Sequence, residues 1–237
     1  MNIKLRAFSR FSRDAKLLIA VSGIFAVSFF GVQTLLKVLY LLRLGYSTEY
    51  IGLFNASGAL VYMGMGLPSG ALGSRFGARR IMLLGGAAAV SGMAILPLTE
   101  FTPPALETLW PVLSQIVLTV GWSMYNVNLV PALMAATTEK TRNDAYALSS
   151  ALREIGGLVG TLFGGMLPGM FAALINQSLD APAPYRFALW VGATLGLTVL
   201  IPLSLIKRSP PVTAEKQTHA KGAFPVLPVA LMVVYVY

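Results

Sequence analysis

Residues 70–80 read GALGSRFGARR and lie between two long apolar stretches of the chain. The segment places three arginines and three glycines among eleven residues. Around it, the 237-residue chain is 56% hydrophobic and only 11% charged. A soluble domain has about 25% charged residues, because it must cover its surface against water. The sequence therefore predicts an integral membrane protein.

The apolar residues gather in stretches long enough to cross a bilayer. A spanning helix needs about 20 mostly apolar residues, and six stretches meet this requirement: 16–42, 48–72, 79–98, 109–136, 145–175 and 185–206. We expect an all-α polytopic membrane protein with a six-transmembrane-helix bundle over 1–206. A Pro- and Lys-rich linker is expected over 207–222, followed by the start of a seventh helix over 223–237.

The positions of the basic residues predict the orientation. If the six stretches cross alternately, 14 Lys and Arg lie on the side of the N-terminus, and only Arg43 and Arg186 lie on the other. Cytoplasmic loops carry such an excess of Lys and Arg. We expect a plasma (inner) membrane protein with a cytoplasmic N-terminus and with residues 99–108 and 176–184 outside. The net charge of +9 follows this topology and forms no single patch, which excludes nucleic acid as a partner.

Residues 70–80 are interpreted as the cytoplasmic turn between the second and third spans. Pro68 and Gly70 are expected to end the second helix, because proline lacks an amide donor and glycine allows a left-handed exit. Gly77 then lets the chain reverse close to the bilayer, and Arg79 and Arg80 face anionic headgroups. An anchor of this kind accounts for the charges, and a gating role is the alternative.

The spacing within this turn is more particular than an anchor requires. It resembles the signature of the major facilitator superfamily, which lies in the loop between that family's second and third helices, at the following positions: Gly70, Arg75, Gly77, Arg79 and Arg80. The resemblance implies that the loop latches the cytoplasmic side, with Arg75 contacting helix ends. The family's acidic residue falls on Ser74, which supplies no charge, so the latch is expected to be weaker here.

The fifth stretch carries a second resemblance. Its glycines are spaced similarly to a glycine-rich motif of drug–proton antiporters in the same superfamily: Gly156, Gly160, Gly164 and Gly165. Thr161 stands where that motif has a proline. Three of the glycines recur every four residues and form one smooth face, which favours close helix packing in lipid. A hinge or occlusion seam is the functional alternative.

The resemblance also implies an architecture. The superfamily has twelve helices in two halves, each built of two inverted three-helix repeats. This chain supplies the first half, so we expect it to be incomplete and to act with a missing C-terminal six-helix half. The implied function is secondary transport of a small organic solute by alternating access, with efflux of amphipathic drugs favoured. The alternative is a non-transporting membrane remnant, scaffold or receptor-like protein.

Polar residues inside the spans are candidates for the substrate cavity, because such groups are costly in a bilayer. The fourth stretch places four of them on one helical face: Gln115, Thr119, Trp122 and Asn126. This amide-and-aromatic stripe suits a neutral or amphipathic ligand, and hydrogen bonding between helices is its structural alternative. Gln33 and Lys37 lie one turn apart in the first stretch, where Lys37 either snorkels outward or binds an anionic group. Asn55 completes the set.

Arg153 and Glu154 form the charged pair of the fifth stretch. Neighbours on a helix point about 100° apart, so we expect the two side chains to face different ways. Arg153 is a cavity candidate, and Glu154, a carboxylate well inside a span, is the candidate for proton coupling. One histidine, no cysteine and no Walker sequence leave no basis for an enzyme, a metal or another cofactor.

Overall fold

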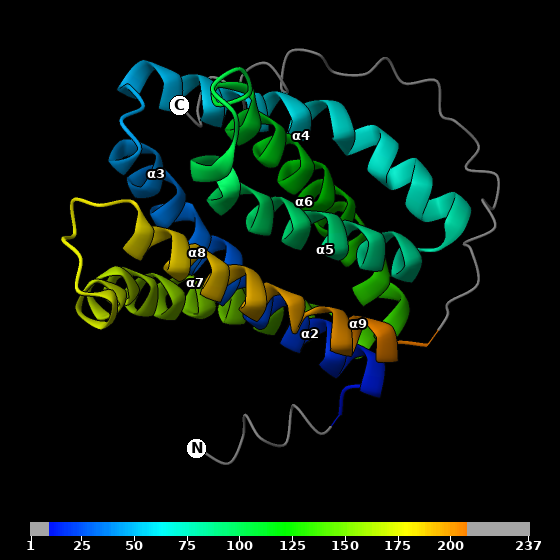
Figure 1. Ribbon diagram of the computed structural model, residues 1–237. Helices are drawn as coiled ribbons and strands as arrows, with labels where there is room; N and C mark the ends of the chain where they lie inside the picture. Colours follow the sequence, from blue (N-terminus) through cyan, green and yellow to red (C-terminus); the bar gives the residue numbers. More distant parts are fainter. Residues whose placement is uncertain (1–9, 208–237) are drawn as a thin grey trace.

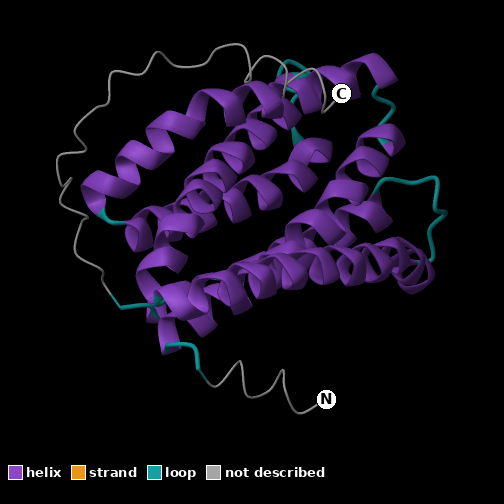
Figure 2. Cartoon of the chain, turned by 180° about the vertical axis from the view of Figure 1, so that it is seen from behind, coloured by secondary structure: helices purple, strands orange, loops and turns teal. Residues whose placement is uncertain are grey.

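The computed structural model describes residues 10–207, and this part of the chain is helical apart from short connections (Figure 1, Figure 2). The elements are α2 (Arg13–Phe25), η1 (Ala26–Gln33), α3 (Thr34–Arg43), α4 (Thr48–Phe76), α5 (Ala78–Ile95), η2 (Leu96–Phe101), α6 (Leu109–Ala136), α7 (Glu139–Ile175), α8 (Ala183–Leu197) and α9 (Leu200–Leu205). η1 is a π-helix that joins α2 and α3 into the first span, and η2 is a short 3-10 extension of α5. Within the described residues, six helical segments are long and apolar enough to cross a membrane, which confirms the predicted fold class.

The helix ends follow capping chemistry more closely than hydropathy. The Ser47 hydroxyl accepts from the amide of Tyr50 and starts α4, and Thr138 and Thr141 form a capping box that starts α7. The second helix does not end at Pro68 and Gly70, so that expectation is wrong. It continues through Pro68 to Phe76, because a membrane helix tolerates an internal proline. Gly77, with φ of 91°, makes the whole turn into α5.

The six spans pack in two groups of three, and each group combines one span from one sequence half with two spans from the other. The first span packs against α7 and α8, whereas α6 packs against α4 and α5 (Figure 1). The first helix of each sequence half thus lies with the second and third helices of the other half. This reciprocal exchange fits the two three-helix repeats that the resemblance implies.

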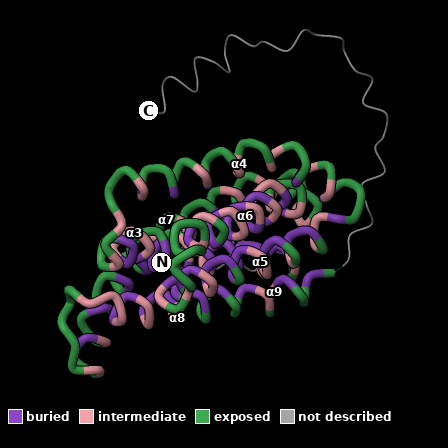
Figure 3. The backbone as a smooth tube through the Cα atoms, turned by 45° about the horizontal axis from the view of Figure 1, so that its top comes forward, coloured by how far each residue is buried: buried purple, intermediate pink, exposed green. Residues whose placement is uncertain are grey.

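Two spans lie on the outside of the bundle. In the most apolar windows of α4 and α7, only 17% and 22% of the residues are buried, compared with 56% in the first span and 56% in α5. Figure 3 shows the tube of α4 mostly in the colours of exposed and intermediate residues, whereas α5 and α6 below it contain more buried residues. The exposed large side chains of α4 and α7 are mainly apolar, so these faces suit contact with lipid or with another membrane-embedded partner.

The end of the bundle opposite the Gly77 turn is tied by polar contacts. Arg186 of α8 pairs with Glu100 of η2 at 2.5 Å, and both side chains are largely buried. The Tyr46 hydroxyl donates to the carbonyl oxygen of Glu107 at 2.8 Å. Burial raises the pKa of Tyr46 to about 12, which further favours the protonated phenol that donates this bond.

Some sequence predictions fall on residues outside the described range. They are the linker beyond residue 207, the start of a seventh helix over 223–237, and the first two basic residues of the N-terminal segment, Lys4 and Arg6.

Candidate substrate cavity

An aromatic cluster occupies the middle of the bundle, and Trp122 of α6 is its centre. The indole stacks on Phe29 with ring centroids 4.6 Å apart and an interplanar angle of 10°. The ring of Phe30 meets the indole edge-on at 5.2 Å. Phe25 and Tyr125 lie 5.2 and 5.6 Å from the indole. Offset-stacked and edge-to-face pairs of this kind are favourable, so the indole is held in one orientation.

A cavity of about 390 Å³, which we call the central pocket, lies beside this cluster. Four elements line it: η1, α4, α6 and α7. The lining residues are Phe30, Tyr62, Trp122, Asn126, Arg153, Glu154 and Gly157. The structure therefore brings together four of the predicted site residues from two separate spans.

Polar contacts fix the walls of the central pocket. The Asn126 amide donates through Nδ2 to the Tyr62 hydroxyl at 2.8 Å, which joins α6 to α4. Arg153 Nε lies 3.3 Å from Glu154 Oε1. The expectation that these adjacent charges face different ways is wrong, because both flexible side chains bend toward each other and line the same pocket. Glu154 is the more exposed of the two, at 76% against 42% for Arg153.

Sequence reasoning missed Tyr62 and Phe30. Each is one aromatic residue within an apolar span, and nothing in its local sequence separates it from a lipid-facing residue. Only the polar partner across the pocket, Asn126, marks Tyr62 as part of the site.

The first two residues of the predicted α6 stripe, Gln115 and Thr119, do not line the central pocket. Gln115 and Thr119 are each only 6% exposed and face Gly58 of α4. Lys37 donates through Nζ to Gln115 Oε1 at 3.4 Å and lies 5.3 Å from the centre of the Phe54 ring. Lys37 therefore does not snorkel outward, because an amide oxygen and an aromatic face receive its charge between the helices.

Two further candidates, Gln33 and Asn55, do not line the central pocket. Gln33, at the end of the π-helix, is 1% exposed, lies beside Gly192 of α8, and has no hydrogen-bond partner for either amide atom. It is thus separated from Lys37, which faces α4 and α6. The Asn55 amide donates to the carbonyl oxygen of Ile51 in its own helix.

The basic turn makes different contacts from those expected. Arg79 donates through Nη2 to the carbonyl oxygen of Ser204 on α9, so it contacts a helix end and does not merely face headgroups. Arg75 is exposed, with its guanidinium 5.2 Å from the centre of the adjacent Phe76 ring. Arg80 is also exposed. The helix-end contact expected of Arg75 is thus made by Arg79 in the described part of the chain.

The small and polar residues near this turn make contacts within α4 and between α4 and α6. The Ser74 hydroxyl donates to the carbonyl oxygen of Ala71 at 2.9 Å, within its own helix. Asn128 of α6 donates to the carbonyl oxygen of Ser69 at 3.0 Å, and Gly73 packs directly on the Asn128 amide. This end of α4 is thus fixed to α6 by packing and hydrogen bonds, without an ion pair among the described residues.

The glycine face of α7 packs on the first span. Gly156 lies against the carbonyl of Gly23, Gly160 against Gly31, and Gly164 against Val32. Gly165 faces open space on another side of α7. The first three glycines form the close helix contact, and Gly165 takes no part in it.

Comparison with known proteins agrees with this architecture. The sequence profile of the Major Facilitator Superfamily matches residues 2–161. Methyl viologen resistance protein SmvA of Salmonella typhimurium is 36% identical over 114 residues, which are 46% of this chain and 21% of the relative. Multidrug resistance protein MdtH of Aeromonas salmonicida is 25% identical over 189 residues, 79% of this chain and 44% of the relative. MdtH of Yersinia enterocolitica is 23% identical over 169 residues, 71% of this chain and 37% of the relative.

The chain spans less than half the length of these curated relatives. The profile match covers most of the chain, including the first four spans and the basic turn. With the six-span helical fold, it shows that the chain belongs to the major facilitator superfamily of membrane transporters.

Proposed function

We propose that the protein is a secondary transporter that exports flat aromatic organic cations, and that the central pocket is this chain's share of the substrate site. The observation that carries the proposal is the placement of an oriented indole, Trp122, in the same pocket as an exposed carboxylate, Glu154. An aromatic face attracts a cation through its quadrupole. A nearby carboxylate adds charge attraction, so the pocket matches a ligand that is both planar and positive.

The names of the relatives support this substrate class. One relative is named for resistance to methyl viologen, which is a flat aromatic dication, and others are named for multidrug resistance. A pocket of about 390 Å³ lies within the size range of small-molecule sites. Its walls come from spans of both sequence repeats, as expected for a transporter site near the bilayer midplane.

Glu154 is proposed to couple export to proton entry. In the resting pocket the carboxylate pairs with Arg153 at 3.3 Å. An incoming cation competes with that guanidinium for the carboxylate, and a proton bound to the carboxylate removes the charge that holds the cation. Exchange of substrate and proton at one group makes the two movements alternate.

We further propose that a second six-helix unit covers the exposed faces of α4 and α7. These two spans are the least buried of the six in their most apolar stretches, and their outer residues are mainly apolar. Rocking of two such units around the central pocket would give alternating access. The N-terminus is proposed to lie in the cytoplasm of a cell with an inner membrane, because the basic residues gather at that end.

The test is uptake of methyl viologen and of an aromatic monocation into everted vesicles, in which export from the cytoplasmic side becomes accumulation, with and without a pH gradient. Glu154→Gln is expected to abolish gradient-driven transport, and Trp122→Phe to weaken apparent affinity by removing indole surface while keeping an aromatic ring. The matched control is Glu107→Gln in an external loop, which should transport normally. Wild-type rates in Glu154→Gln would refute the coupling role. An inactive wild type, assayed in vesicles together with its second six-helix unit, would favour the non-transporting alternative.

A further inference from the structure

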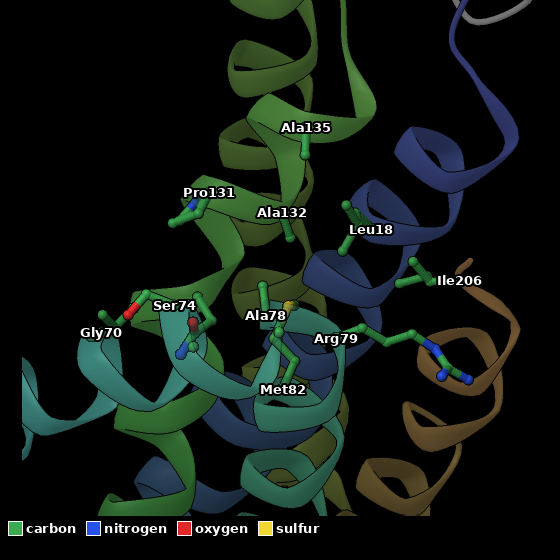
Figure 4. Close-up of a pocket in the computed structure, with 14 residues that line it drawn as sticks. Leu18, Gly70, Ser74, Ala78, Arg79, Met82, Pro131, Ala132, Ala135 and Ile206 are labelled. Atoms are coloured by element: carbon green, nitrogen blue, oxygen red, sulfur yellow. The ribbon is translucent and has the colours of Figure 1, made fainter. Parts of the chain in front are cut away.

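A second cavity lies at the basic end of the bundle, and it shares no residue with the central pocket. We call it the basic-end pocket. It has a volume of about 310 Å³ and lies between the Gly77 turn, α6, the start of α2 and the segment after α9 (Figure 4). Its walls are mainly apolar side chains, among them Leu18, Met82, Val127, Ala132, Ala135 and Ile206.

Two polar groups of this wall, the Ser74 hydroxyl and the Asn128 amide nitrogen, already have partners. The Ser74 hydroxyl donates to Ala71, and the Asn128 amide donates to the carbonyl oxygens of Ser69 and Met124. A water molecule occupies about 30 Å³ and needs two to four polar partners, so an apolar space about ten times that size is a poor site for water. The pocket suits a hydrocarbon occupant.

Positive charge lies at the rim of the same pocket. Arg79 lines it, and its side chain runs along the edge toward α9 (Figure 4). One nitrogen, Nη2, bonds to the Ser204 carbonyl, while Nε is buried and has no hydrogen-bond partner. Within residues 10–207, the three ion pairs lie elsewhere, and none involves Arg75, Arg79 or Arg80.

We propose that the basic-end pocket binds one acyl chain of an anionic phospholipid, with Arg79 bound to its phosphate. The two halves of such a lipid match the two halves of the site. The apolar walls accept the chain, and the guanidinium offers unused donors in the geometry that phosphate oxygens prefer. The site lies at the end of the spans where anionic headgroups attract Lys and Arg.

The family signature and this site are connected through Ser74. An acidic residue at position 74 would add negative charge beside the pocket, and the serine leaves the arginines of the turn without that charge. A bound phosphate would supply it from the lipid. Because Arg79 also contacts Ser204, the bound lipid would join the Gly77 turn to the end of the sixth span.

The experiment measures lipid binding to the purified protein in a neutral detergent, by native mass spectrometry and by the shift in unfolding temperature. Phosphatidylglycerol is expected to bind and stabilise, whereas phosphatidylcholine and the chain-free headgroup glycerophosphoglycerol should do neither. Arg79→Gln should weaken phosphatidylglycerol binding by about tenfold or more, since it removes a charged hydrogen bond. Its matched control is Arg80→Gln, which removes an equal charge next to the pocket but does not line it.

A second pair of variants tests the hydrocarbon part. Ala132→Leu fills the pocket and should lower binding, whereas Ala71→Leu makes the same change on an exposed position of α4. If Ala132→Leu unfolds, Ala135→Leu at the mouth replaces it. Equal binding of phosphatidylcholine, equal losses in Arg79→Gln and Arg80→Gln, or binding of the chain-free headgroup would each overturn the proposal. No lipid bound to the wild type would also overturn it.

Discussion

The contact between α7 and the first span can be tested with two glycines of the same helix. Gly160 lies in the contact, and a Cβ added there would come within 2.8 Å of Val27 Cα and 2.9 Å of Gly31 Cα. These are backbone atoms, so relief requires the two helices to move apart. Gly165 stands five residues further on, with no atom within 4 Å of an added Cβ.

The expected difference follows from two opposing effects. Replacing glycine with alanine inside a helix gains about 1 kcal/mol of helix propensity, and this gain applies at both positions. Overpacking at Gly160→Ala costs about 1–3 kcal/mol. The two variants should therefore differ by about 1–3 kcal/mol in the free energy of unfolding, with Gly165→Ala the more stable. At about 2–4 °C per kcal/mol for a chain of this size, the difference in unfolding temperature is roughly 2–12 °C.

The assay is thermal unfolding of both variants in the same detergent, monitored by circular dichroism. The wild type should lie between the two or close to Gly160→Ala. Equal unfolding temperatures for Gly160→Ala and Gly165→Ala would refute the claim that the glycine face is a close backbone contact. Close packing would then not explain why Gly156, Gly160 and Gly164 recur every four residues.

Three further predictions concern other contacts. Arg186→Ala should lower the free energy of unfolding by about 3–5 kcal/mol in denaturant titrations, since it leaves the buried carboxylate of Glu100 unpaired; Arg43→Ala, from an exposed pair, should leave the midpoint nearly unchanged. Asn128→Ala should cost about 1–3 kcal/mol in the same titrations, because it removes donors from buried carbonyl oxygens, and an unchanged midpoint would contradict this. Pro103→Cys should react with an impermeant maleimide added outside intact cells, and labelling only after permeabilisation would reverse the proposed topology.

Hydropathy is sufficient to predict the six spans, because a bilayer demands length and apolarity from every spanning helix. The predicted bounds of 109–136 match α6 at both ends. Hydropathy places the start of α7 at 145, but the helix begins at Glu139, since a capping box extends it through a polar segment. The second span is predicted to end at residue 72, but α4 continues to Phe76. Pro68 is tolerated inside this membrane helix, although a proline breaks helices in water far more strongly.

The site is harder to predict because it depends on contacts between spans. One-helix periodicity groups Gln115, Thr119, Trp122 and Asn126, but the neighbouring helices divide them between a packed contact and the central pocket. One-helix periodicity also places Gln33 and Lys37 on one face, but Gln33 lies beside α8 whereas Lys37 contacts α6 and α4, and these contacts depend on the neighbouring helices.

The length of α7 connects the protein to the thickness of its bilayer. Its 37 residues make a rod of about 55 Å, whereas the hydrocarbon core of a bilayer is about 30 Å thick. The helix must tilt or project into the headgroup region, and a thinner or thicker membrane changes how much of each it does. Because α7 holds the first span through its glycine face and carries Arg153 and Glu154, any change in tilt is transmitted to the central pocket. The acyl-chain length of the surrounding lipid can therefore change the geometry of the central pocket without direct contact between a lipid and that pocket.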